Sequence, residues 1–290
     1  MDTNGKLNSR QIDFYREEGY LLLPDVLQEE DLLPVQQAME EKVEEIAQQL
    51  NREGRIDSLY QQASFETRLA LLFAGKTDQE FLRYGRSWRE RRPGYFHLMT
   101  RPVILDMVES LIGAEIFANP VYNTRPKVPG VAAGAVPWHQ DRSYWPDANA
   151  NPVITVWVPL VNADEENGCL HIWPRTHRTR LLSWHSEQIT GTGYTEVDEQ
   201  HLQRIAKRRE PVMLPLQRGG VIIFNDRCVH MSTPNRSQKV RWSVDLRYQP
   251  TDQDPMPGHG AGFLARSKKY PCKTASLQDW LQGKPEHTDS

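Results

Sequence analysis

Residues 219–248 read GGVIIFNDRCVHMSTPNRSQKVRWSVDLRY and contain two strand patterns on either side of one histidine. The first, at 219–225, is a short run of β-branched and aromatic residues that ends at a turn-forming asparagine. In the second, at 239–248, apolar and polar side chains alternate, as in a strand whose two faces differ. Its apolar face carries Val240, Trp242, Val244 and Leu246, and its polar face carries Arg241, Ser243, Asp245 and Arg247. A polar strand face lies either against solvent or against the wet interior of a small barrel, and the alternation leaves both readings open.

Further strand patterns precede this stretch and are separated by clusters of Gly, Pro, Asn and Asp. Short strands with regular turn signals predict a sandwich or a jelly roll. A charged insert at 185–210 interrupts them, and we expect it to be helical. The strand sequences are AEIFANPVYN (114–123), NPVITVWVPLV (151–161), GCLHIWP (168–174) and EPVMLPL (210–216).

The residues before Gly113 have helical rather than strand periodicity. Apolar side chains recur every three or four residues in 29–49, and a further helix at 102–112 ends at Gly113. Ser9 is a candidate cap for a first helix, and 20–23 has the pattern of a short buried strand. We therefore predict one domain, mainly β with flanking helices. It comprises a mostly helical flank at 1–113, a jelly-roll core at 114–250 and a C-terminal extension at 251–290.

Composition excludes several classes of protein. The net charge of −3 and the pI near 6.3 argue against a nucleic-acid-binding surface, which needs a basic excess. No apolar run approaches the roughly 20 residues that span a bilayer, so we expect no membrane association. The three cysteines are far apart, which favours a reducing, cytoplasmic location over a disulfide framework. We expect a monomer or a homodimer that acts on a small molecule.

One triplet has the pattern of a metal site. His139, Gln140 and Asp141 follow a Gly/Pro-rich run, and in a strand the first and third of them share a face. Two histidines and one carboxylate are the ligands of non-haem iron(II) oxygenases, and His230 is the best third ligand. By itself the triplet also fits an ordinary histidine and aspartate near a surface turn.

The triplet is one part of a longer pattern that resembles the phytanoyl-CoA dioxygenase family over roughly residues 115–250. The segment FYREEGYLLLPDVL at 14–27 is also similar to the opening of that family. One departure is Trp173 and Arg175, where the family often has Pro-Gly-Ser-His in a loop that shapes substrate access. The matching blocks are WHQD (138–141), VWVPL (156–160), NGCL (167–170), WPRTH (173–177) and HMSTPNRS (230–237), followed by Arg241.

The resemblance implies a double-stranded β-helix of the cupin-like kind, with Fe(II) inside one end and 2-oxoglutarate and O2 as cosubstrates. His139, Asp141 and His230 would then be the metal ligands and catalytic residues. By family position, Arg241 would pair with the distal carboxylate of 2-oxoglutarate and Ser232 would hydrogen-bond it. Trp157 would line that pocket, and Asn123 is a weaker match to a cosubstrate-contacting amide. Arg247, on the same strand face, competes with Arg241 and has Asp245 as an alternative partner; it is also a candidate substrate contact.

Substrate contacts are predicted from position alone. Arg142, Tyr144 and Trp145 follow the metal triplet directly, where a loop must leave the barrel mouth. We expect them to border the open side of the metal site, although the aromatic side chains equally fit a packed barrel rim.

The resemblance implies hydroxylation of an unactivated C–H bond of a small organic metabolite, with release of succinate and CO2. The same chemistry also serves desaturation, cyclisation and epimerisation of natural products. The carboxylate of Asp141 stands where related halogenases have a small residue, so halogenation is disfavoured. A non-catalytic cupin-like binding protein and a zinc hydrolase are alternatives from other classes. An arginine placed for a cosubstrate carboxylate argues against both.

Overall fold

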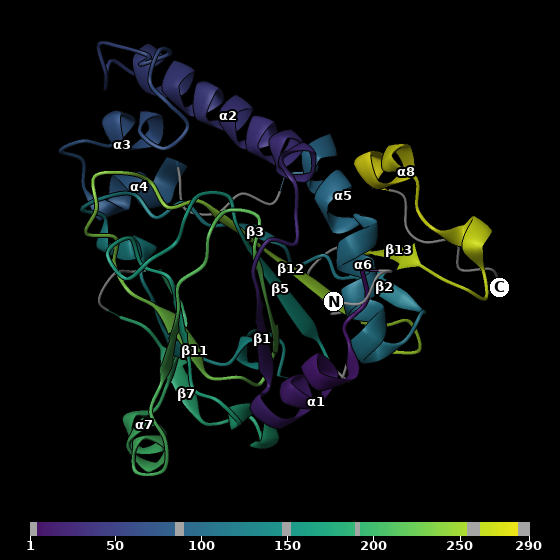
Figure 1. Ribbon diagram of the computed structural model, residues 1–290. Helices are drawn as coiled ribbons and strands as arrows, with labels where there is room; N and C mark the ends of the chain where they lie inside the picture. Colours follow the sequence, from purple (N-terminus) through teal and green to yellow (C-terminus); the bar gives the residue numbers. More distant parts are fainter. Residues whose placement is uncertain (1–4, 85–89, 147–151, 189–191, 254–261, 284–290) are drawn as a thin grey trace.

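Two antiparallel sheets form the centre of the computed structural model, which describes residues 5–84, 90–146, 152–188, 192–253 and 262–283 (Figure 1). The larger sheet has the order β1-β10-β5-β12-β2-β13, with β3 also paired to β12, and the smaller has the order β4-β11-β6-β9. The jelly roll predicted from the strand pattern is confirmed. The strands are β1 (Tyr20–Leu23), β2 (Ile116–Ala118), β3 (Asn123–Thr124), β4 (Val136–His139), β5 (Ile154–Pro159), β6 (Leu170–Ile172), β7 (Trp184–Ser186), β8 (Thr195–Val197), β9 (Val212–Leu214), β10 (Val221–Asn225), β11 (His230–Ser232), β12 (Ser243–Pro250) and β13 (Phe263–Arg266).

Helices from the first 113 residues lie above the larger sheet, to its right and below it in the view of Figure 1. The α-helices are α1 (Ser9–Glu18), α2 (Glu29–Arg52), α3 (Arg68–Leu72), α4 (Asp78–Tyr84), α5 (Pro93–Met99), α6 (Pro102–Ile112), α7 (Glu199–Ala206) and α8 (Leu277–Gln282). Short 3-10 helices are η1 (Ala132–Gly134), η2 (Asp141–Tyr144), η3 (Thr176–Arg178) and η4 (Pro271–Lys273).

The segment that contains strand β12 has one face against the helices and the other face against an internal cavity. The apolar side chains of 240–248 belong to the main core cluster, together with residues of α2, α5 and α6. Trp242 stacks on Phe65, with ring centroids 4.8 Å apart, and its indole Nε1 donates to the Phe65 carbonyl at 3.0 Å. The polar side chains of the same segment are also buried, and they line an internal cavity. The barrel interior, and not solvent, therefore lies against the polar face.

Strands from outside 114–250 complete the larger sheet. β1 pairs with β10 in antiparallel register, from Tyr20 against Phe224 to Leu23 against Val221. At the other edge, β13 pairs with β2. The core sheet thus draws one strand from the helical flank and one from the C-terminal extension.

Two sequence expectations need correction. Asn8, rather than Ser9, caps α1: its side chain accepts a hydrogen bond from the Gln11 backbone amide. The 185–210 insert is helical only in its second half, α7, and its first half is the β7–β8 hairpin. Thr195 and Val197 are buried in β8, so two-residue alternation decides the structure there.

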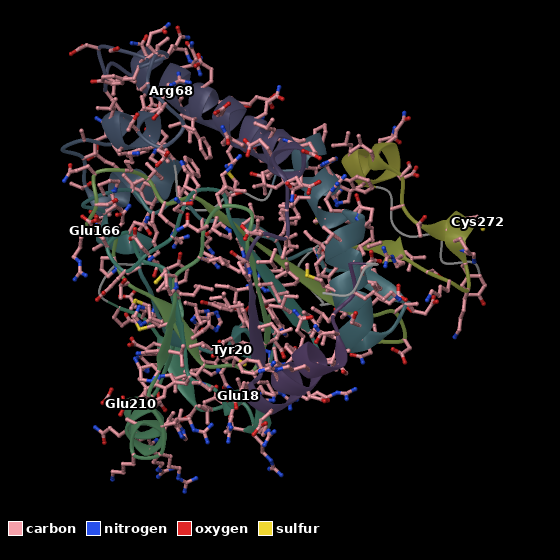
Figure 2. The ribbon with its side chains drawn as sticks, in the orientation of Figure 1. Glu18, Tyr20, Arg68, Glu166, Glu210 and Cys272 are labelled. Carbon is pink, nitrogen blue, oxygen red and sulfur yellow. The ribbon has the colours of Figure 1, made fainter. Side chains whose placement is uncertain are left out.

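Ion pairs connect the outer elements to one another and to a loop of the core; Arg68 and Glu18 are labelled in Figure 2. Arg68 of α3 pairs with Glu44 of α2 and donates from Nε to the Leu59 carbonyl at 3.1 Å. Arg175 pairs with Glu18 at the end of α1, with Nε 2.9 Å from the carboxylate. The loop in which the sequence departs from the family therefore lies against α1. Neither Trp173 nor Arg175 is among the described residues that line the cavity.

Candidate active site

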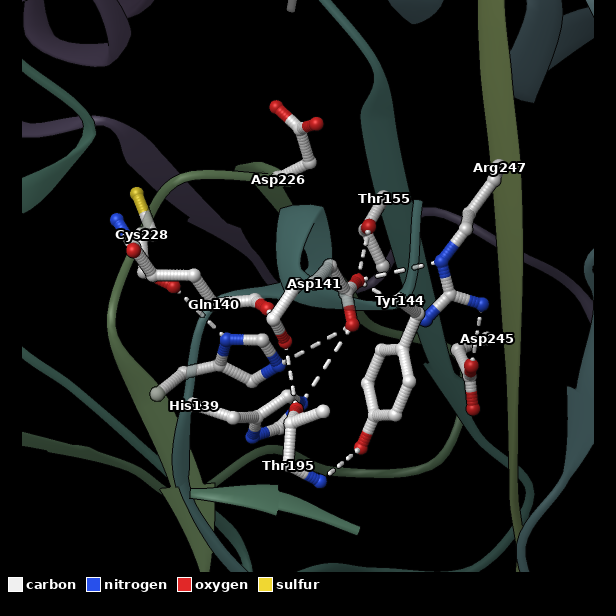
Figure 3. Close-up of polar contacts among 12 residues, drawn as sticks. His139, Gln140, Asp141, Tyr144, Thr155, Thr195, Asp226, Cys228, Asp245 and Arg247 are labelled. Carbon is white, nitrogen blue, oxygen red and sulfur yellow. Dashed lines mark hydrogen bonds and ion pairs between the residues drawn. The ribbon is translucent and has the colours of Figure 1, made fainter. Parts of the chain in front are cut away.

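Three side chains with metal-ligand chemistry converge inside the barrel (Figure 3). His139 ends β4 and His230 begins β11, and the two residues face each other in the antiparallel register of these strands. Asp141 follows at the start of η2. Its Oδ1 lies 3.5 Å from Nε2 of His139 and 4.0 Å from Nε2 of His230. The three potential donor atoms all lie within 4.8 Å of one another, and all three residues are buried. A single ion could therefore contact all three side chains.

Backbone carbonyls set the orientation of both imidazoles. Nδ1 of His139 lies 2.9 Å from the Pro137 carbonyl, and Nδ1 of His230 lies 3.0 Å from the Cys228 carbonyl. In each ring Nδ1 therefore carries the proton, and the lone pair of Nε2 is directed at the shared site. Burial, with the neighbouring His139 imidazole, lowers the pKa of His230 to about 3. His230 is thus a neutral imidazole at physiological pH.

Asp141 has one engaged and one unengaged oxygen. Its Oδ2 accepts hydrogen bonds from Thr155 Oγ1 at 2.7 Å and from Arg247, whose Nη2 and Nε lie at 2.9 and 3.2 Å. Its Oδ1 is buried, has no hydrogen-bond partner among the described residues and faces the two imidazoles. Burial opposes ionisation, but the Arg247 charge and the His139 contact outweigh it and hold the pKa of Asp141 well below its usual range. An ionised oxygen without a hydrogen-bond partner among the described residues, beside two imidazoles, suits a divalent cation.

Arg247 and Arg241 share a strand face but have different partners. Arg247 pairs with Asp141 and also with Asp245, whose carboxylate lies 2.7 Å from Nη1. Its guanidinium carbon lies 5.4 Å from the centre of the Trp145 ring. The alternative partner that the sequence offered Arg247 is the one observed. Arg247 holds Asp141 in place, and its charge is compensated by carboxylates of the chain.

Arg241, by contrast, is buried with no carboxylate in ion-pair distance within the described part of the chain. It donates to Ser243 Oγ and to the Gly168 carbonyl at 3.2 Å, while its Nε has no partner. The guanidinium lies 5.5 Å from the Trp157 ring centre. Burial lowers the pKa of Arg241 to about 9. Arg241, Ser232 and Trp157 all line the cavity that holds the three metal-site residues.

A second buried basic side chain, that of Lys127, lies beside Arg241 and was not anticipated from the sequence. The two residues form a backbone bridge, and Lys127 Nζ donates to the carbonyls of Ser232, at 3.3 Å, and Thr233. Burial, together with the Arg241 charge, lowers the pKa of Lys127 well below its usual value. Its position after a proline in a Gly/Pro-rich run has no periodicity, so no local pattern marks it as buried. Three further residues line the cavity although no sequence motif predicted them: Arg125, Thr155 and Tyr194.

Comparison with known proteins identifies the family. Residues 15–243 match the sequence model of phytanoyl-CoA dioxygenase (PhyH). The chain belongs to this family. It is 24% identical over 249 residues to the peroxisomal phytanoyl-CoA dioxygenase of Bos taurus, covering 84% of this chain and 69% of that protein. It is 23% identical over 292 residues to the phytanoyl-CoA dioxygenase domain-containing protein 1 of Danio rerio, covering 87% and 98%.

Solved structures share the family fold at lower identity. EctD from S. alaskensis, with 2-oxoglutarate and 5-hydroxyectoine, gives a TM-score of 0.62 at 19% identity, covering 87% of this chain and 79% of that one. The carbocyclase SnoK from nogalamycin biosynthesis gives 0.59 at 22% identity, covering 87% of each chain. The epimerase SnoN gives 0.57 at 21% identity, covering 87% and 91%. As a family member with an intact His-Asp-His cluster, the chain is a non-haem iron dioxygenase that takes Fe(II), 2-oxoglutarate and O2.

The three residues expected to border the open side of the metal site do not line the cavity. Arg142 is buried, with Nε 2.7 Å from Asp226 Oδ2, and Trp145 is buried with Nε1 3.4 Å from the same oxygen. Tyr144 packs edge-on to His139, with ring centres 5.8 Å apart, and its hydroxyl accepts from the Thr195 amide. None of these three residues is among the described residues that line the cavity. The buried Asp226 provides the reason for two of them, because its carboxylate binds the Arg142 guanidinium and the Trp145 indole.

Asn123 also lies outside the cavity lining. Its side-chain amide donates to Asp245 Oδ2 at 2.8 Å and so helps to orient a carboxylate of the cavity wall.

Among the described residues, none of the helices combines the length and apolar character needed to cross a membrane.

Proposed function

We propose that this protein hydroxylates an unactivated C–H bond of a small organic metabolite. Substrate, 2-oxoglutarate and O2 are converted to hydroxylated product, succinate and CO2, so that one oxygen atom enters the product and the other enters succinate. His139, Asp141 and His230 are the proposed metal ligands and catalytic residues. Arg241, with Ser232 and Trp157, is the proposed binding site for the distal end of 2-oxoglutarate.

The uncompensated charge of Arg241 carries this proposal. A buried cation is costly unless an anion pairs with it, and within the described residues no carboxylate does so. The planar guanidinium can meet a carboxylate with two parallel hydrogen bonds, which suits the distal end of a dicarboxylate. Ser232 offers a hydroxyl on the same wall, and Trp157 supports the guanidinium face. The zinc hydrolase and the non-catalytic binding protein leave this cation unexplained.

The donor set fits iron(II). Two imidazoles and one ionised carboxylate would supply three ligands and leave further positions open for the cosubstrates. When bound there, the metal supplies the oxidising chemistry. Thr155 and Arg247 fix the Asp141 carboxylate so that Oδ1 is directed at the imidazoles. The carbonyls of Pro137 and Cys228 hold the ring orientations.

The decisive experiment measures succinate release from 2-oxoglutarate with Fe(II) and ascorbate, against a panel of small metabolites. We expect succinate to be released together with a product whose mass has increased by one oxygen atom. A product that has lost two hydrogens would indicate desaturation or cyclisation, and one of unchanged mass would indicate epimerisation. Asp141→Ala is the control and should release no succinate above background. If the wild-type protein released no succinate, either by itself or with any compound of the panel, the proposal would be overturned.

The cellular location and the oligomeric state of the protein are also proposed. The three cysteines are free, with Cys169 and Cys228 buried, which supports a reducing compartment and a cytoplasmic protein. A monomer or homodimer is our expectation for its assembly.

A further inference from the structure

The guanidinium of Arg125 lies on the cavity wall, and its described neighbours engage two of its three nitrogens. Its Nε lies 3.1 Å from Asp245 Oδ1, and its Nη1 lies 3.1 Å from the Tyr194 hydroxyl. The Tyr194 ring packs under the guanidinium, with 5.6 Å between the guanidinium carbon and the ring centre. The third nitrogen, Nη2, makes no hydrogen bond to any residue that the structure describes. Arg125 is therefore held by two neighbours in a geometry that leaves one donor nitrogen available.

The ionisable residues of the cavity wall leave a positive excess. Among the described lining residues, the guanidiniums of Arg125, Arg241 and Arg247 face only two carboxylates, Asp141 and Asp245. The excess is one positive charge with Lys127 counted as neutral, and larger if it is protonated. Iron(II) and the 2-oxoglutarate dianion cancel each other, so the proposed cofactors do not remove it. Nearby Arg142 and Asp226 form a neutral pair and leave the count unchanged.

The remaining charge can be assigned to one residue. Asp141 and Asp245 both engage Arg247, and Arg241 is the proposed partner of 2-oxoglutarate. Arg125 shares Asp245 with Arg247, so the single carboxylate is divided between two guanidiniums. Arg125 is also the least buried of the three cavity arginines, with 20% of its side chain exposed. It is accordingly the cation that an incoming molecule can reach.

We propose that the organic substrate carries a carboxylate, and that Arg125, held by Asp245 and Tyr194, recognises it. Arg125 thereby becomes a specificity-determining residue, distinct from the arginine proposed for 2-oxoglutarate. This inference rests on the proposed function for the identity of the site. A second anion in the cavity compensates the charge that the chain and the cofactors leave over.

The test uses matched pairs of ligands. Short- and medium-chain monocarboxylates, each paired with its primary amide, are titrated into protein loaded with nickel(II) and 2-oxoglutarate, and binding is measured by thermal shift. Substrate-stimulated succinate release is measured in parallel with iron(II). We expect wild-type protein to prefer the carboxylate by about tenfold or more in at least one pair, the range of a charge-assisted hydrogen bond. Arg125→Gln should abolish the preference, and Arg125→Lys should retain part of it.

The carboxylate-to-amide ratio separates recognition from general damage. Loss of stability in Arg125→Gln weakens both members of a pair equally, whereas loss of recognition weakens only the acid. Arg10→Gln, an exposed arginine on α1, is the matched control and should leave the ratio unchanged. A wild-type protein that prefers no carboxylate, or an Arg125→Gln variant that keeps the preference, would overturn the inference. If the protein preferred carboxylates but released no succinate, the proposed function would be overturned, while carboxylate recognition by Arg125 would be supported.

Discussion

Arg247 donates from two nitrogens to the same oxygen of Asp141, with Nη2 at 2.9 Å and Nε at 3.2 Å. This contact keeps Oδ2 engaged and leaves Oδ1 as the oxygen that faces His139 and His230. Among the described residues Arg247 makes no hydrogen bond to either histidine, so it acts through Asp141, as a positioning residue.

We expect Arg247→Gln to weaken metal binding by about tenfold to hundredfold, since loss of an outer partner of a metal ligand typically has this effect. Calorimetric titration of the metal-free protein with manganese(II) would measure it. Arg247→Lys keeps the charge and should lose less. Unchanged manganese affinity in a folded Arg247→Gln protein would contradict the positioning role.

Arg241→Ala should raise the apparent KM for 2-oxoglutarate by roughly a hundredfold, because a hydrogen-bonded charge pair is lost. The KM for the organic substrate should change far less, and manganese affinity should stay near the wild-type value. Arg241→Lys keeps the charge without the planar fork, so a several-fold rise is expected. Steady-state succinate release provides both KM values. If 2-oxoglutarate dependence survives Arg241→Ala untouched, the assignment of this arginine is wrong.

Glu109 on α6 should make stability depend on pH. Lys268, Lys6 and Arg266 contact its carboxylate at 2.6, 2.8 and 2.9 Å, and they lower the pKa of Glu109 to about 2. The unfolded value is about 4.3, so this stabilisation is complete above about pH 5 and is lost as the pH falls towards 2. Glu109→Gln should cost roughly 1 kcal/mol at pH 7 and almost nothing near pH 2. Melting temperatures of both proteins across this range test it, and a difference that grows on acidification would contradict it.

Trp242→Ala should destabilise the fold by about 3–5 kcal/mol, the usual cost of removing a buried aromatic side chain. Trp242 is fully buried between the larger sheet and Phe65, so the truncation leaves a cavity and removes the Nε1 hydrogen bond. Trp184→Ala is the matched control, because Trp184 is 39% exposed in β7, and it should cost less than about 1 kcal/mol. Urea unfolding measures both. Equal losses in the two variants would show that the packing of Trp242 contributes little.

Sequence reasoning located the metal-site cluster because its signals are local or depend on spacing. His139 and Asp141 lie two residues apart, and His230 follows a recognisable strand and turn. The structure brings all three together, as predicted. The change from helical to strand periodicity near Gly113 likewise predicted the flank and the jelly roll, since period 3.6 and period 2 are directly visible in a sequence.

The local sequence pattern did not determine the direction of the side chains that follow the His139–Asp141 triplet. Arg142 and Trp145 are polar or amphipathic and follow the ligands, which suggested the cavity mouth. Asp226, which lies 84 positions after Arg142 and 81 after Trp145, binds both of them. A partner so distant in sequence leaves no local signal, and the same reason concealed the burial of Lys127.

The sequence by itself determined which residues of 239–248 share a face, because successive strand residues point to opposite sides. It also predicted the three members of the His-Asp-His cluster, which the structure brings together, and the family. Only the tertiary structure decided that the polar face encloses a cavity, because this depends on the second sheet closing over the first. Only the structure separated Arg241 from Arg247: the two are equivalent in pattern, and the carboxylates of Asp141 and Asp245 meet one of them and leave the other uncompensated.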